Sequence, residues 1–136
     1  MDDTRARQSI VLIVGEDSGA RCQSLVESLG ATCYRAFSMA EATASLAHHA
    51  PDVVVADYDL PDGNGIELIT SLRQTKEHRS TPVILLTGEI HPAQLERAVM
   101  AGLYAFLAKP FNSQEFVKLV NAAISESADR VRGSNG

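Results

Sequence analysis

The stretch DVVVADYDLPDGNG at residues 52–65 runs from a continuous apolar segment into an aspartate, Asp57, and then into turn-forming residues. A short apolar run without alternation is typical of a strand buried on both faces, as in a parallel sheet covered by helices. The proline, glycine and asparagine that follow mark a turn. The stretch therefore predicts a parallel strand of an α/β fold with Asp57 at its carboxyl end.

Four other short apolar runs predict four more strands: IVLIV at 10–14, ATCYRAF at 31–37, PVILLT at 82–87 and AFLA at 105–108. The segments after the five strands carry apolar residues at helical spacing. Start and stop signals support these helices: Gly30 after the first, Ser38 and Glu41 as a capping box for the second, Pro61 ahead of the third, His91 and Pro92 at the start of the fourth, and Asn112 and Glu115 as a cap pair for the fifth.

The order of a strand followed by a helix, repeated five times, predicts a doubly wound (βα)5 sheet under the right-handed crossover rule. We expect the flavodoxin-like strand order 2-1-3-4-5. Such sheets form their functional site beyond the carboxyl ends of the strands, beside strand 1. Chemistry is therefore expected at that edge.

The chain has 136 residues, of which 45% are hydrophobic, and this suits one domain. Fold signals cover residues 10–126, so we expect residues 1–9 to be a flexible N-terminus and residues 127–136 a C-terminal tail or linker. No apolar run approaches the roughly 18 residues of a membrane span, and the first residues do not resemble a signal peptide. We expect a cytoplasmic protein without membrane contact.

The net charge of −5 argues against direct nucleic-acid binding, which normally uses a basic surface. Output is therefore expected to pass through protein contacts. The two cysteines, Cys22 and Cys33, have neither CxxC spacing nor nearby histidines, so we interpret them as reduced core residues rather than as a disulfide or a metal site.

Polar residues follow four of the predicted strands, whose ends meet at one edge of the sheet. They are Glu16 and Asp17 after strand 1, Asp57 and Asp59 after strand 3, Thr87 after strand 4 and Lys109 after strand 5. Crowded carboxylates repel one another, and a hard divalent cation commonly neutralises them. The set predicts a Mg²⁺ site made by Glu16, Asp57 and the backbone carbonyl of Asp59, with Asp17 as a substitute ligand.

An aspartate beside such an ion can attack a phosphoryl group as a nucleophile. Lys109 would place a positive charge near the phosphoryl oxygens, and Thr87 would donate a hydrogen bond to one of them. Each residue alone also fits an ordinary structural role, such as a solvated lysine or a strand-end threonine. Their joint occurrence at one sheet edge favours the functional interpretation.

The run from Asp57 to Gly65 resembles the D-x-x-x-P-x-x-[DN]-G signature of response-regulator receiver domains. Thr87 and the pair Lys109–Pro110 are similar to the family's two other fixed points, and the resemblance covers about residues 10–126. It implies that Asp57 accepts a phosphoryl group, with Mg²⁺, from a sensor histidine kinase or a phosphotransfer protein. It also implies a Lys-Pro bond that is typically cis, and no enzymatic activity beyond the domain's own phosphorylation and dephosphorylation.

The resemblance assigns a switch to Thr87 and Phe106. In the family the hydroxyl at the place of Thr87 swings toward the phosphoryl group, and the aromatic ring at the place of Phe106 turns inward behind it. Burial of a phenylalanine is worth about 1.5–3 kcal/mol, which is enough to bias two nearly equal states. The face of helix 4, strand 5 and helix 5 would then change shape for an effector protein or domain, and a homodimer is a further expectation.

One position departs from the family. Receivers usually carry two adjacent acids after strand 1, whereas this chain has Gly15 followed by Glu16. The second acid, which the family uses as the direct metal ligand, is present as Glu16, and the first is missing. Two outcomes remain open: a lower metal affinity, or replacement of the lost charge by Asp17.

Three alternatives follow from these observations. A pseudo-receiver would be a phosphorylation-independent protein-interaction module, and Gly15 favours it. A haloacid-dehalogenase-like phosphatase would use Asp57 and Asp59 as a D-x-D pair, but that motif usually follows the first strand and this one is followed by Pro61. A flavodoxin would need a neutral or basic phosphate loop after strand 1, where this chain is acidic.

Overall fold

The computed structural model describes residues 9–16 and 19–135, with side chains described as far as residue 127. Five strands form one parallel sheet: β1 (Ile10–Val14), β2 (Thr32–Ala36), β3 (Val53–Asp57), β6 (Val83–Thr87) and β7 (Ala105–Ala108). Their spatial order is β2-β1-β3-β6-β7, which confirms the predicted order 2-1-3-4-5. Each strand lies within one residue of its predicted bounds.

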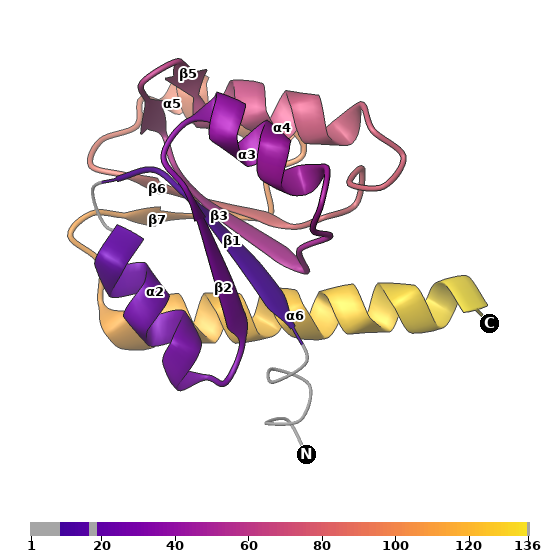
Figure 1. The fold of residues 1–136 in the computed structure, drawn as a ribbon. Helices are drawn as coiled ribbons and strands as arrows, with labels where there is room; N and C mark the ends of the chain where they lie inside the picture. The colour runs from indigo at the N-terminus through magenta and orange to yellow at the C-terminus, as the bar shows by residue number, and fades with distance from the viewer. Residues whose placement is uncertain (1–8, 17–18, 136) are drawn as a thin grey trace.

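Helices cover both faces of the sheet, and Figure 1 shows the layers. Their bounds are α2 (Gly19–Ser28), α3 (Met39–Leu46), α4 (Gly65–Arg73), α5 (Pro92–Ala101) and α6 (Ser113–Asn135). Helices α2 and α6 lie on one face, whereas α3, α4 and α5 lie on the other. The prediction of a (βα)5 sheet covered on both sides is confirmed.

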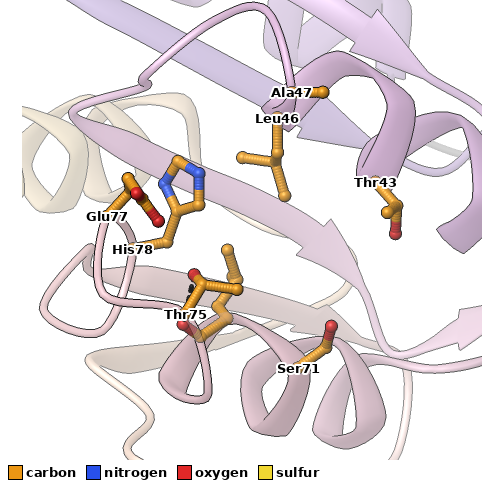
Figure 2. A pocket seen from close by; sticks show the side chains of 8 residues that line it. Thr43, Leu46, Ala47, Ser71, Thr75, Glu77 and His78 are labelled. Carbon is orange, nitrogen blue, oxygen red and sulfur yellow. Dashed lines mark hydrogen bonds between the residues drawn. The ribbon is translucent and has the colours of Figure 1, made fainter.

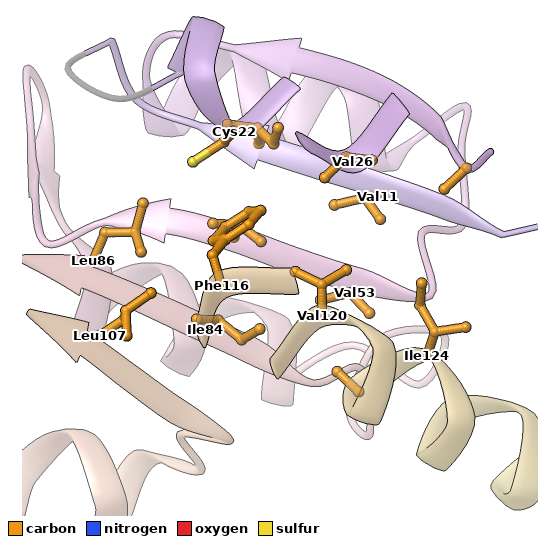
Figure 3. Packing of buried hydrophobic residues seen from close by; sticks show 14 of the residues in the cluster. Val11, Cys22, Val26, Val53, Ile84, Leu86, Leu107, Phe116, Val120 and Ile124 are labelled. Atoms are coloured by element: carbon orange, nitrogen blue, oxygen red, sulfur yellow. The ribbon is translucent and has the colours of Figure 1, made fainter. Parts of the chain in front are cut away.

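Alternate residues of the buried strands point into two separate cores, as the pleat of a strand requires. On one face, Val53 and Ile84 pack against Val26 of α2 and Phe116 of α6 (Figure 3). On the other face, neighbouring strand residues such as Leu85 pack against α3, α4 and α5. The central strands are therefore apolar without interruption because both of their faces are covered.

The helix caps agree with the predictions only in part. The Ser38 hydroxyl accepts a hydrogen bond from the Glu41 N–H at 3.1 Å, but the Glu41 carboxylate accepts from the N–H of Phe37 at 2.8 Å, not of Ser38. The predicted capping box is thus half formed, with its second bond shifted by one residue. At α6, the Asn112 side chain accepts from the N–H groups of Gln114 and Glu115.

Two segments differ from the expectations. The turn after Asp57 contains a short antiparallel hairpin of β4 (Asp59–Leu60) and β5 (Gly63–Asn64), which the sequence did not predict. Helix α6 continues to Asn135, beyond residue 126, where the fold signals of the sequence end. Residues 125–132 contain no proline or glycine, and therefore nothing breaks the helix there. The role of residues 127–136 as a tail or linker stays a prediction.

Candidate phosphoryl-transfer site

The structure brings the predicted residues to the carboxyl edge of the sheet. Asp57 is the last residue of β3, Thr87 is the last residue of β6, and Lys109 directly follows β7. The strand register places Asp57 beside Leu86 and Thr87 beside Ala108, so the three functional residues lie on adjacent strand ends. Residues about 50 positions apart in sequence thus share one site.

Asp57 and Lys109 form an ion pair at the centre of the site. The Lys109 Nζ lies 2.9 Å from Oδ1 of Asp57, and Asp57 is only 5% exposed. The backbone N–H of Lys109 donates to the Thr87 carbonyl at 2.7 Å, and the Lys109–Pro110 peptide bond is cis, as the resemblance implies. A buried carboxylate is tolerated when such a cation compensates its charge.

Gly15 packs directly against this carboxylate. Its φ of +119° lies in a region that residues with a side chain rarely adopt, and its N–H donates to the Ala36 carbonyl at 2.8 Å. A Cβ atom at this position would overlap with Oδ2 of Asp57 and would lie 2.7 Å from its Cγ. The missing acid is therefore replaced by a close backbone contact with Asp57.

The Thr87 hydroxyl is directed at its own loop in this structure. It donates to the Glu89 carbonyl at 2.8 Å and accepts from the Glu89 N–H at 3.3 Å. Phe106, the second predicted switch residue, is 38% exposed on β7. These two positions match the state that the resemblance assigns to a receiver before phosphorylation.

Two further acids, Glu16 and Asp59, follow strands that end at the same edge of the sheet as Asp57. Glu16 is exposed directly after β1, and Asp59 is exposed in β4, two residues after Asp57. Asp17, the predicted substitute ligand, lies outside the described residues. Within the described part of the chain, no group of three or more histidine, cysteine or acidic side chains could hold a metal. Two carboxylates and a carbonyl still fit Mg²⁺, which usually keeps several water ligands.

The loop after Asp57 makes two capping contacts that the sequence analysis did not predict. Asn64 and Glu67 form a reciprocal capping box at the start of α4, with both bonds at 3.0 Å. The N-x-x-E spacing is a signal that could have revealed this cap. The Asp62 carboxylate binds the first turn of α3, and because these partners are far apart in sequence no local pattern indicates the contact.

The two cysteines are free and are interpreted correctly as core residues. Cys22 is buried and Cys33 is half-buried. Burial, with a smaller contribution from the charge of Asp57, raises the pKa of Cys22 to about 12. Burial also raises the pKa of Cys33 to about 11. Both thiols are therefore protonated and weakly nucleophilic at neutral pH.

A cavity of about 380 Å³ lies between α3 and α4, away from Asp57. Figure 2 shows its lining, which includes Leu46, Ser71, Thr75, Glu77 and His78. None of the predicted site residues lines it.

Among the described residues, no helix combines the length and the apolar content that crossing a membrane requires.

Comparison with known proteins identifies the family. Residues 11–121 match the model of the response regulator receiver domain. The chain is 32% identical to the DNA-binding transcriptional regulator NtrC of Escherichia coli K12 in an alignment of 134 residues, which covers 95% of this chain and 28% of NtrC. It is 28% identical to the polar-differentiation response regulator DivK of Brucella ovis over 105 residues, covering 77% of this chain and 85% of DivK.

The fold agrees with that of solved receivers. The signal receiver domain of an HD domain-containing protein from Pseudomonas fluorescens Pf-5 superposes with a TM-score of 0.84 at 27% identity, covering 93% of each chain. The present chain belongs to the response regulator receiver domain family, whose members are phosphorylation-dependent signalling switches that bind Mg²⁺ in the active site. It spans less than a third of the length of the NtrC relatives it matches.

Proposed function

We propose that Asp57 is the phosphoacceptor of this receiver and that a sensor histidine kinase or a phosphotransfer protein is its donor. The observation that carries the proposal is the buried Asp57 carboxylate at the sheet edge, held 2.9 Å from the Lys109 ammonium. Burial beside a fixed cation orients the nucleophile and provides a charge for the incoming phosphoryl oxygens. Thr87, at the next strand end, supplies a hydroxyl for the same oxygens.

The transfer forms one bond and breaks another. A carboxylate oxygen of Asp57 attacks the phosphorus of the donor phosphohistidine, the P–O bond forms, and the P–N bond breaks to leave the imidazole, which regains a proton. Mg²⁺, held by Glu16, Asp57 and the Asp59 carbonyl, would neutralise charge on the transferring group. The Lys109 ammonium would then leave the Asp57 carboxylate and form an ion pair with the phosphoryl group. In this proposal the domain catalyses only its own phosphorylation and dephosphorylation.

The output face would be formed by α5, β7 and α6. In α5, Met100 is 82% exposed and Val99 is 58% exposed, and Phe106 lies on β7. When Thr87 leaves the Glu89 carbonyl for the phosphoryl group, space behind it becomes available to the Phe106 ring. An effector protein or domain, or a second copy of the chain, would bind the altered face. This would take place in the cytoplasm, and the domain would not bind nucleic acid directly.

Gly15 favours one alternative, a pseudo-receiver that acts as a phosphorylation-independent interaction module. Its backbone occupies the position of the family's first acid and contacts the Asp57 carboxylate directly. The site therefore has fewer charges with which to attract a cation. In that case the chain would bind its partners with Asp57 and Lys109 permanently paired.

A mass measurement separates these two functions. The protein and its Asp57→Asn variant are incubated with a small phosphodonor, such as acetyl phosphate, and Mg²⁺, and intact masses are recorded. The phosphoacceptor proposal predicts a gain of one phosphate in the wild type and none in the variant. An unchanged wild-type mass, under conditions that label another receiver, would favour the pseudo-receiver.

A further inference from the structure

The turn of the β4–β5 hairpin holds the start of a helix from an earlier part of the chain. The N–H of Met39 donates to Oδ1 of Asp62 at 2.8 Å, and the N–H of Ala40 donates to Oδ2 at 3.0 Å. Asp62 and Pro61 form the turn between the two short strands. One carboxylate thus joins the segment that follows Asp57 to the first turn of α3.

The contact completes the capping of α3. The first N–H groups of a helix have no partner within the helix and need acceptors from elsewhere. Ser38 supplies an acceptor for the N–H of Glu41, while Asp62 supplies those for Met39 and Ala40. The same backbone hydrogen bonds lower the pKa of the exposed Asp62 carboxyl below its usual value, and the group is charged at neutral pH.

The hairpin itself requires such anchors, because each strand contains only two residues. On its α4 side it is held by the Asn64 cap and by the Gly65 N–H, which donates to the Tyr58 carbonyl at 2.7 Å. On its α3 side, Asp62 is joined by a close contact between Gly63 and the sulfur atom of Met39, where a Cβ atom at Gly63 would overlap. The hairpin is therefore fixed between two helices.

We infer that Asp62 is a positioning residue of the phosphorylation site, acting through the hairpin that it ties to α3. The inference rests on the proposed function, because the group to be positioned is the backbone carbonyl of Asp59, a proposed Mg²⁺ ligand in β4. Asp62 lies three residues after Asp59, in the turn of the same hairpin. Without its carboxylate the hairpin loses its two hydrogen bonds to α3 and keeps only the Gly63–Met39 contact there, so the carbonyl is held less firmly.

The first measurement reports how firmly the hairpin is held, in the absence of Mg²⁺ and phosphodonor. Amide hydrogen exchange is compared in the wild type, Asp62→Ala, Asp62→Asn and the matched control Ser38→Ala, which removes a cap from the same helix but leaves the hairpin tie intact. We expect Asp62→Ala to accelerate exchange of the Gly65 amide about five- to tenfold, the size of effect that loss of a helix cap produces. Ser38→Ala should leave the Gly65 amide unchanged.

The second measurement determines the Mg²⁺ affinity of each variant by titration. We expect about tenfold weaker binding in Asp62→Ala, typical of losing a group that supports a metal ligand, and no change in Ser38→Ala. Asp62→Asn keeps one acceptor oxygen and should lie between wild type and Asp62→Ala in both measurements.

The outcomes separate the two proposals. If Asp62→Ala retains the wild-type Gly65 exchange rate and Mg²⁺ affinity, the positioning role is wrong. If Gly65 exchange accelerates but Mg²⁺ affinity is unchanged, Asp62 holds the hairpin without serving the site, which also overturns the inference. If the wild type itself neither binds Mg²⁺ nor accepts phosphate, the proposed function fails. A role for Asp62 in positioning the site fails with it, and the exchange data then describe a structural cap only.

Discussion

At the scale of single residues, Gly15 and Asp57 meet across the ends of β1 and β3. The sequence reveals that Gly15 replaces an acid, but it does not reveal what takes the place of that acid. In the structure the Asp57 carboxylate packs on the Gly15 backbone, whose φ is +119°. Glycine is therefore required here by a positive φ and by a close approach, both of which depend on how two strands pack.

We predict that Gly15→Ala destabilises the protein by about 1–2 kcal/mol, because the new Cβ both disfavours the positive φ and displaces the Asp57 carboxylate. Urea unfolding measures the change. Gly88→Ala is the matched control in the loop after β6, since a Cβ atom at Gly88 would have no atom within 4 Å. Equal stabilities of the two variants would show that the Gly15 contact is not close in solution.

The same contact makes an unusual prediction for Gly15→Asp, which restores the family's acid pair. We expect no gain in Mg²⁺ affinity, because the added side chain competes with Asp57 for the same space. A Mg²⁺ titration of this variant beside the wild type measures the effect. A clear increase in affinity would mean that only the missing charge, and not the packing, limits the metal site.

The cysteines give a prediction about pH. The pKa of Cys22 rises from 9.0 to about 12, and that of Cys33 rises to about 11, so both thiolates form only at pH values above the ordinary range. At pH 8 the thiolate fraction of Cys22 should be about a thousandfold lower than that of an unperturbed thiol. Labelling with a thiol reagent should therefore be slow in the native protein and should accelerate up to pH 10 without a plateau. Native labelling as fast as that in urea would contradict this.

At the scale of secondary-structure elements, the loop after β6 and the strand β7 form the proposed switch. The Thr87 hydroxyl is bound to Glu89, and Phe106 is partly exposed. The chain contains no tryptophan, so Phe106→Trp introduces a single fluorescent reporter. We predict that its emission shifts to shorter wavelength on addition of phosphodonor and Mg²⁺, because the ring becomes buried.

Thr87→Ala in the reporter background provides the control for this experiment. It should still accept phosphate at Asp57 but should lose most of the fluorescence shift, because the hydroxyl that couples the two events is absent. Asp57→Asn should lose both. A full shift in the Thr87→Ala reporter would show that Phe106 moves independently of Thr87.

The elements also show where sequence patterns are sufficient. Apolar runs locate all five strands. The central strands β1, β3 and β6 are buried on both faces and are therefore continuously apolar, whereas the edge strands β2 and β7 are only partly buried. The Asp59–Asn64 hairpin was not predicted because its strands are too short to carry a pattern, and Pro61 and Gly63 indicate only a turn. The extension of α6 to Asn135 was not predicted, because a polar composition indicates exposure but does not by itself show where a helix ends.

At the scale of the whole molecule, topology assembles the site. Asp57, Thr87 and Lys109 could be assigned to one place from sequence because parallel strands direct their carboxyl ends to one edge, and the Asp57–Lys109 pair lies there at 2.9 Å. The Asp62 contact with α3 could not be predicted, since it depends on how a loop and a helix from different βα units meet.

The central claim is that Asp57 itself carries the phosphoryl group, and reductive mapping tests it most directly. The protein is treated with phosphodonor and Mg²⁺ and then with borohydride, which reduces an aspartyl phosphate to homoserine, and the peptides are sequenced by tandem mass spectrometry. We predict homoserine at position 57 and at no other acid of the site. Conversion at Glu16 or Asp59, or no conversion in a protein that binds Mg²⁺, would contradict the assignment.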